Sequence, residues 1–141
     1  MKKRFKRAGW AFIILLIGIQ FVPIARTNPP EPKEAPELRE IRGLLQRSCY
    51  DCHSNDTRWP WYSHVAPISF LIARDVKEGR REVNFSLWDG YTPQRKARKL
   101  GEIAKQVESG SMPQWYYVLM HPEARLSQSD KEAIVKWARR P

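Results

Sequence analysis

Several common catalytic patterns are missing from this sequence. It contains no paired carboxylates suited to general acid–base catalysis, no serine–histidine arrangement and no glycine-rich phosphate loop. Stretches in which apolar and polar residues alternate, which would predict half-buried strands, are hard to find, and no segment repeats. We therefore expect an all-α protein that is not an enzyme.

Acidic residues are absent from the first 26 positions, which hold six of the 25 lysines and arginines. The rest of the chain has 19 basic and 15 acidic residues, a net charge of only +4. The charge of the whole chain, +10, therefore comes mainly from its N-terminus. Because the remaining surface is only mildly basic, we expect no nucleic-acid partner.

The basic N-terminus is followed by a run without charge. Residues 1–8 hold five positive charges, and residues 9–25 hold no charge of either sign. This pattern is typical of a secretory signal or a membrane anchor, with a buried core helix as the alternative. Because Pro23-Ile24-Ala25 is a poor cleavage site, residues 1–26 are predicted to be an uncleaved signal anchor, a single transmembrane helix at the short end of the usual range. The positive-inside rule would then export the rest of the chain.

A proline-rich linker and one small domain are predicted after the anchor. Residues 27–37, TNPPEPKEAPE, hold four prolines and no large apolar side chain, which predicts a semi-rigid spacer outside any core. Residues 38–141 then form the domain. A domain of roughly 100 residues supports one modest core, which a covalent cofactor or a metal would help to stabilise.

Apolar spacing and end signals predict four helices in this domain, joined by long loops rich in aromatic residues and proline. The second and third of them are predicted to end at glycines. We place the helices at 37–48, at 67–79 and, after Thr92 as the N-cap, at 93–109. The fourth, opened by a capping box of Ser127 and Asp130, lies close to the C-terminus.

The segment RSCYDCHSND (47–56) contains both cysteines of the chain. Cys49, Cys52 and His53 match C-x-x-C-H, the pattern by which proteins attach c-type haem. On a helical turn, positions i, i+3 and i+4 share one face, so two thiols can bond to the haem vinyl groups while the imidazole binds the iron. The motif predicts one covalent haem c, with His53 as the proximal iron ligand.

Met112 is the candidate for the distal iron ligand. It follows a predicted helix closely and precedes a proline. A thioether opposite an imidazole is the ligation of electron-carrying cytochromes c. Met120, His64 and His121 are rival distal ligands, and a His64 ligand would give a bis-histidine site. A gap-filling core position is the alternative role for Met112.

Two other interpretations of the cysteines stay open. A zinc site would need Cys49 and Cys52 together with His64 and His121, which are 57 residues apart, and it would leave His53 unexplained. A redox-active disulfide is chemically possible in an exported protein. Thioredoxin-like chemistry, however, goes with a βαβ pattern that this chain does not have.

Five tryptophans lie in the predicted domain, most of them beside prolines or tyrosines. Because aromatic rings suit the wall of a haem crevice, we expect WPWYS (59–63) and the segment around Trp115 to form one. Trp137, on the last helix, is expected to lie in the core. Tyr50 and Asp51, between the cysteines, are expected to point outward and to matter little for the chemistry.

Six segments extend the motif: CYDCHS (49–54), WPWYS (59–63), APIS (66–69), GRREVNFSLW (79–88), MPQWYY (112–117) and HPEARLS (121–127). Together they resemble the small bacterial haem-binding domain family of cytochrome c-like proteins, over residues from about 38 to 141. The resemblance implies a monohaem c-type fold that is membrane-anchored or periplasmic and transfers electrons. The Gly-Pro that often follows the haem histidine in mitochondrial-type cytochromes is absent here.

The expectation is thus an exported, membrane-anchored electron carrier with an all-α, cytochrome c-like domain. It would lie at the bacterial inner membrane as a single-pass protein, with the haem domain facing the periplasm or the cell exterior. Redox partner proteins are expected, but the sequence does not identify them. The alternatives are a haem-based ligand or redox sensor, a peroxidase-like enzyme with an open sixth iron position, and a zinc-binding structural domain.

Overall fold

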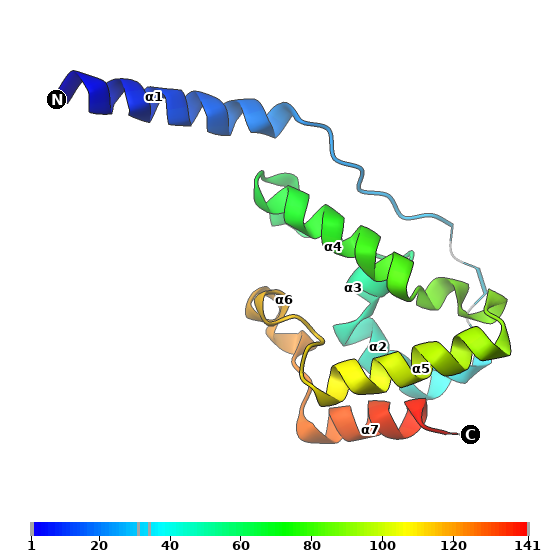
Figure 1. The fold of residues 1–141 in the computed structure, drawn as a ribbon. Coiled ribbons are helices and arrows are strands. Elements are labelled where there is room, and N and C mark those ends of the chain that lie inside the picture. The colour runs from blue at the N-terminus through cyan, green and yellow to red at the C-terminus, as the bar shows by residue number, and fades with distance from the viewer. Residues whose placement is uncertain (1, 31, 34, 141) are drawn as a thin grey trace.

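The structure, a computed structural model, describes residues 2–30, 32–33 and 35–140. These residues form helices and no strand, which confirms the all-α prediction (Figure 1). The α-helices are α1 (Lys2–Gly18), α2 (Arg42–Ser48), α3 (Tyr50–His53), α4 (Ile68–Glu82), α5 (Pro93–Glu108), α6 (Trp115–Met120) and α7 (Gln128–Ala138). The 3-10 helices are η1 (Ile19–Phe21), η2 (Pro36–Ile41), η3 (Trp61–His64), η4 (Phe85–Gly90) and η5 (Pro122–Ala124).

Helix α1 stands apart from the rest of the molecule (Figure 1). It begins in the basic segment and continues into the apolar run, where most of its large side chains are exposed. The helix ends at Gly18, and after η1 the chain becomes extended. None of the helices in the described part of the chain is both long enough and apolar enough to cross a membrane, so the predicted transmembrane helix is not confirmed.

The proline-rich segment runs along the domain and is held by side-chain contacts. Asn28 donates a hydrogen bond to the Thr57 carbonyl, and its own side-chain oxygen accepts from Trp59 and Arg80. Ala35, within the segment predicted as a spacer, is 2% exposed and belongs to the core. The domain therefore includes the end of the predicted spacer, because these distant contacts outweigh its polar, proline-rich composition.

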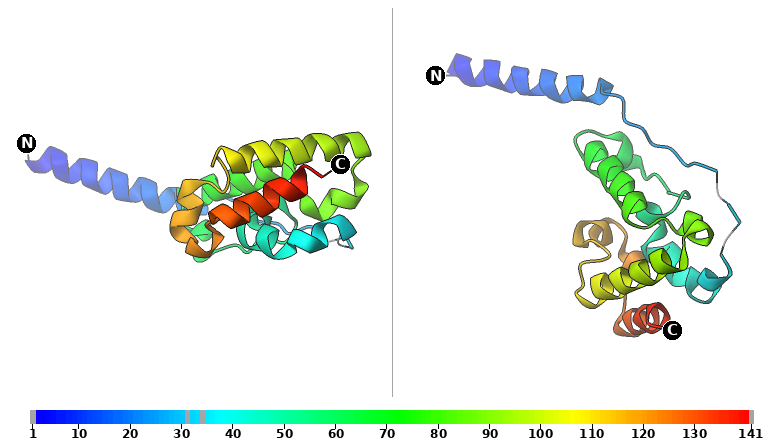
Figure 2. Two further views of the ribbon diagram at one scale, coloured as in Figure 1. Left: turned by 90° about the horizontal axis from the view of Figure 1, so that it is seen from below. Right: turned by 45° about the vertical axis from the view of Figure 1, so that its right-hand side comes forward.

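The core of the domain lies between η2, α2, η4, α5 and α7, and Figure 2 shows α5 and α7 side by side in both views. Aromatic rings connect the cysteine motif to this core. Tyr50 stacks on Phe85 with ring centroids 5.7 Å apart, and Trp88 contacts both Phe85 and Trp137. The predicted core position of Trp137 is confirmed, and its indole donates to the Glu37 carbonyl.

The predicted helices are present with some changes in their bounds. The segment 37–48 is divided between η2 and α2, whereas 93–109 corresponds closely to α5. Ser127 forms the predicted capping box with Asp130 at the start of α7. Helix α3 corresponds to the helical turn expected for the cysteine motif, whereas α6 was not predicted, because six residues are too few to reveal a helical period.

Helix α4 continues past Gly79, its predicted end, as far as Glu82. Gly79 is instead the point of closest approach between α3 and α4. A Cβ atom at this position would lie 2.4 Å from the Cys52 carbonyl oxygen and 3.1 Å from the Cys52 Cβ. The two helices therefore meet backbone to backbone, which requires a residue without a side chain.

Replacing Gly79 with alanine is expected to destabilise the domain, because the obstructing atom is backbone and one of the helices must move. Overpacking of this kind costs about 2 kcal/mol of unfolding free energy. Gly101→Ala is the matched control, since a Cβ inside α5 at that position would meet nothing within 4 Å. This control should gain roughly 0.5–1 kcal/mol from helix propensity. Urea unfolding of the two variants measures both effects, and similar stabilities would contradict the close contact.

Candidate functional site

A cavity of about 650 Å³ lies between η3, α3, α4, α5 and α6. Its volume is within the range of sites that hold cofactors and other small molecules. Most of the residues that line it are apolar or aromatic, among them Trp61 and Trp115 from the two predicted aromatic segments. The chain brings four predicted site residues to this cavity: Cys49, Cys52, His53 and Met112.

The cysteine motif forms a single helical turn. The Cys49 carbonyl accepts hydrogen bonds from the amides of Cys52, at 3.2 Å, and His53, at 2.9 Å. Both cysteines are free thiols that are half-buried in the cavity wall. Burial raises the pKa of each thiol to about 12, whereas redox-active cysteines have a lowered pKa. The two thiols are therefore neutral near pH 7, which argues against the redox-disulfide interpretation.

The ring of His53 is held by the backbone at the C-terminal end of α4. Its Nδ1 lies 2.9 Å from the Gly79 carbonyl oxygen and 3.2 Å from that of Val83. Two acceptors at this nitrogen place the ring proton on Nδ1, which leaves the lone pair of Nε2 for a ligand. Burial lowers the pKa of His53 and so favours the neutral ring. A neutral imidazole that donates from Nδ1 to a backbone carbonyl is the usual form of a metal-binding histidine.

Met112 reaches the cavity through the turn that ends α5. Gly110 has a left-handed conformation, with φ of 71°, and the amides of Ser111 and Met112 both donate to the Gln106 carbonyl. The chain reverses at this turn and brings Met112 into the cavity wall. His64, the alternative distal ligand, is exposed at the end of η3 and is not part of the cavity wall.

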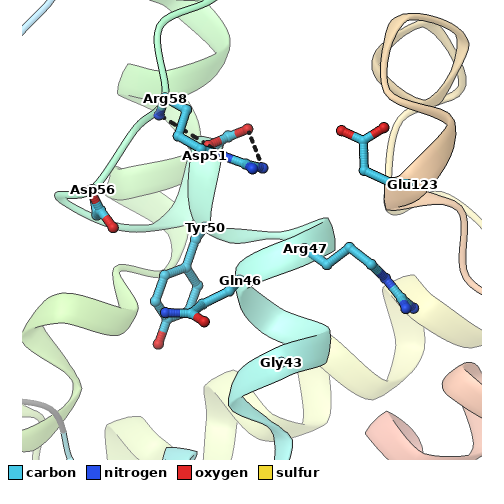
Figure 3. Close-up of a pocket in the computed structure, with 8 residues that line it drawn as sticks. All are labelled: Gly43, Gln46, Arg47, Tyr50, Asp51, Asp56, Arg58 and Glu123. Atoms are coloured by element: carbon cyan, nitrogen blue, oxygen red, sulfur yellow. Dashed lines mark hydrogen bonds and ion pairs between the residues drawn. The ribbon is translucent and has the colours of Figure 1, made fainter.

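Asp51 and Tyr50 are buried, so the prediction that they point outward was wrong. The Asp51 carboxylate accepts hydrogen bonds from the Tyr117 hydroxyl, at 2.7 Å, and from the backbone and guanidinium of Arg58 (Figure 3). Asp51 and Arg58 line the main cavity and also a second pocket of about 370 Å³, which Figure 3 shows. Tyr50 and Asp51 are buried because the short α3 is packed against both α2 and α4, which leaves little of its surface exposed to solvent.

Two further hydroxyl groups in the cavity wall have partners. Tyr116 donates to Asp75 at 2.7 Å, and burial together with this bond raises the pKa of Tyr116 to about 12. The Tyr62 hydroxyl and His121 Nε2 are 2.5 Å apart, and His121 Nδ1 lies 3.2 Å from a Glu123 carboxylate oxygen. Since both nitrogens of His121 are engaged, this residue is not a free metal ligand. Sequence reasoning missed the Tyr116–Asp75 and Tyr62–His121 pairs because their members lie 41 and 59 residues apart in the chain.

Zinc binding receives no support from this arrangement. In the part of the chain that the structure describes, no three histidine, cysteine or acidic side chains gather as a metal site. The zinc interpretation needs His64 beside the cysteines, and His64 lies outside the cavity. Two neutral thiols, an imidazole with a free Nε2 and a thioether around an apolar cavity are instead the groups that hold haem. The residues therefore fit this cofactor.

No curated protein and no solved structure matches the chain. The sequence model of one family, described as a haem-binding domain, matches residues 14–140. This match covers nearly the whole chain and includes all of the cavity wall. It also extends N-terminally beyond the predicted domain, into the second half of α1. The chain belongs to the haem-binding domain family.

Proposed function

We propose that this haem-binding domain is a monohaem c-type cytochrome that transfers electrons. The observation that carries the proposal is the convergence of Cys49, Cys52, His53 and Met112 on one apolar cavity. Haem binding follows from the family. Covalent attachment of the haem, its axial ligation and electron transfer are the further parts of our proposal.

The two cysteines would supply the covalent bonds. Each Sγ would be placed to add to one vinyl group of a bound haem, with a new carbon–sulfur bond and the thiol proton going to the other vinyl carbon. The addition is redox-neutral and needs no external oxidant. The turn of α3 suits this role because it brings Cys49, Cys52 and His53 to the same cavity.

His53 and Met112 would supply the axial ligands. The hydrogen bonds from Nδ1 to Gly79 and Val83 fix the plane of the imidazole and direct its Nε2 away from α4. A bound haem would supply a one-electron Fe(III)/Fe(II) couple, and a methionine opposite histidine raises its potential. The apolar and aromatic wall would exclude water, which further favours the less charged ferrous state.

A peroxidase-like enzyme is the second candidate, because the cavity contains a hydroxyl–imidazole pair. The Tyr62 hydroxyl is 2.5 Å from His121 Nε2, and His121 is in contact with the exposed Glu123. Such a pair is suited to moving a proton between a bound substrate and solvent. This reaction also needs an open sixth position on iron, so the role of Met112 distinguishes the two functions.

We further propose that α1 attaches the protein to the bacterial inner membrane, with the haem domain on the periplasmic or outer side. The basic N-terminal turns followed by exposed apolar side chains support this arrangement. The redox partners would then be proteins that reach the domain on that side of the membrane.

Covalent attachment predicts that haem stays on the chain after denaturation. The full chain, expressed with c-type maturation machinery, should give a haem-stained band on a denaturing gel. Cys49→Ser with Cys52→Ser should remove the stain, since no thiol remains to form a thioether. His64→Ala is the control and should keep it, because this side chain lies outside the cavity. A wild-type chain that loses its haem on denaturation would exclude c-type attachment.

Axial ligation predicts different effects for two methionines of the cavity wall. Met112→Ala should change the oxidised haem from low-spin to high-spin and lower its reduction potential, because the iron loses a thioether ligand. Met120→Ala should leave both unchanged, since Met120 is half exposed at the edge of the cavity. Visible and electron paramagnetic resonance spectra with a redox titration measure these effects.

An unchanged low-spin spectrum in Met112→Ala would eliminate Met112 as the ligand. A wild-type haem that is already high-spin, with peroxidase turnover that falls in Tyr62→Phe, would instead favour the second candidate.

A further inference from the structure

The exposed apolar side chains of the domain are concentrated at one end of it. Among the described residues from 35 onward, eight large hydrophobic side chains are exposed, and all but Leu87 belong to two segments, 61–70 and 115–120. These segments are η3 with the first turn of α4, and helix α6. The exposed members are Trp61, Val65, Ile68, Phe70, Trp115, Leu119 and Met120, which we call the apolar rim.

The two segments of the apolar rim also contain no Asp, Glu, Lys or Arg, although 28% of the chain is charged. Trp61 and Trp115 are its most exposed members, at 74% and 76%. Part of the rim surrounds the cavity, so a bound haem would cover some of this surface. Val65 and Phe70 lie outside the cavity wall and would stay exposed. The rim is therefore more than the edge of the haem site.

The apolar rim lies at the same end of the molecule as the C-terminal end of α1. The Gln20 side chain, just after α1, donates to the Ala66 carbonyl at 3.1 Å and accepts from the Ala66 amide at 3.0 Å. Arg26 donates to the Ser63 carbonyl at 3.2 Å. In Figures 1 and 2, the start of α4 and helix α6 lie at the edge of the domain nearest to α1, whereas η4, which carries Leu87, lies at the opposite edge.

We infer that the apolar rim lies in the interfacial layer of a lipid bilayer, so that the haem cavity opens towards the membrane surface. The inference rests on the proposed membrane attachment through α1. If the exposed apolar side chains of α1 enter the bilayer, the bilayer surface near its C-terminal end meets the beginning of α4 and helix α6. Continuity with the exposed apolar side chains of α1 favours lipid over a soluble protein as the occupant.

The chemistry of the apolar rim matches this layer. Tryptophan is enriched where hydrocarbon meets lipid headgroups, because its ring is apolar and its N–H can still find a polar partner. A patch with tryptophan and aliphatic side chains and without formal charge avoids the cost of placing ions against acyl chains. A redox partner that reaches the cavity from the rim would then be associated with the membrane.

Site-specific photo-crosslinking in phosphatidylcholine vesicles tests the inference. The haem-loaded full chain carries benzoylphenylalanine in place of Val65 or Leu119, and variants are compared at equal haem content. Leu87 is the matched control, since it is 46% exposed and Val65 is 43% exposed. Ile14 of α1 reports on membrane attachment itself. We expect lipid adducts by mass spectrometry at Val65, Leu119 and Ile14, several-fold above the level at Leu87.

Each other outcome overturns the inference in a distinguishable way. Adducts at Ile14 without adducts at Val65 and Leu119 would leave membrane attachment standing and place the rim away from lipid. No adduct at Ile14 or at the rim would remove the attachment as well. Crosslinks from Val65 to a second copy of the chain would make the rim a protein interface, and equal labelling at Leu87 would show that contact with lipid is unspecific.

Discussion

The close contact of α3 with α4 is the constraint on which the site depends. Gly79 allows the Cys52 carbonyl to approach the backbone of α4. The carbonyls of Gly79 and Val83, one helical turn apart, then accept the hydrogen bonds that His53 Nδ1 donates. The same contact thus sets the distance between two helices and the orientation of the histidine ring. Phe85, shortly after α4, lies against both His53 and Tyr50 and continues this geometry into the aromatic core. A movement of α4 would therefore displace the site and the core together.

Features that depend on neighbouring residues could be predicted from the sequence. The cysteine motif requires only that five residues form one turn, and it does so. The caps at Thr92 and Ser127 depend on hydrogen bonds to residues three positions later, so the starts of α5 and α7 were confirmed closely. The resemblance to the haem-binding domain family is confirmed by the family match, because its motifs occur throughout the domain.

Features that depend on distant segments could not be predicted. A glycine in a helical pattern is either a stop signal or a point of close contact, and only the position of Cys52 shows that Gly79 is the second. A weak signal was present, since three charged residues with good helix propensity follow Gly79 and continue the helix. Asp51 was expected in solvent because nothing near it in sequence reveals Tyr117, which lies 66 residues away. In each case tertiary packing outweighed the local pattern.

Helix α6 illustrates how polar contacts can position an apolar surface. It has no fully buried residue, and Tyr116, Tyr117 and Val118 are half-buried, so burial of side chains accounts for only part of its position over the cavity. Its tyrosines instead donate to aspartates on two other elements, Tyr116 to Asp75 of α4 and Tyr117 to Asp51 of α3. Hydrogen bonds to charged groups contribute about 1.5–3 kcal/mol each, so the two bonds together help to hold this six-residue helix in place. Because these bonds use the hydroxyl groups, the apolar side chains of α6 stay free to face a cofactor on one side and the surroundings on the other. Asp51 and Asp75 thus belong to an apolar site because they fix the wall that encloses it.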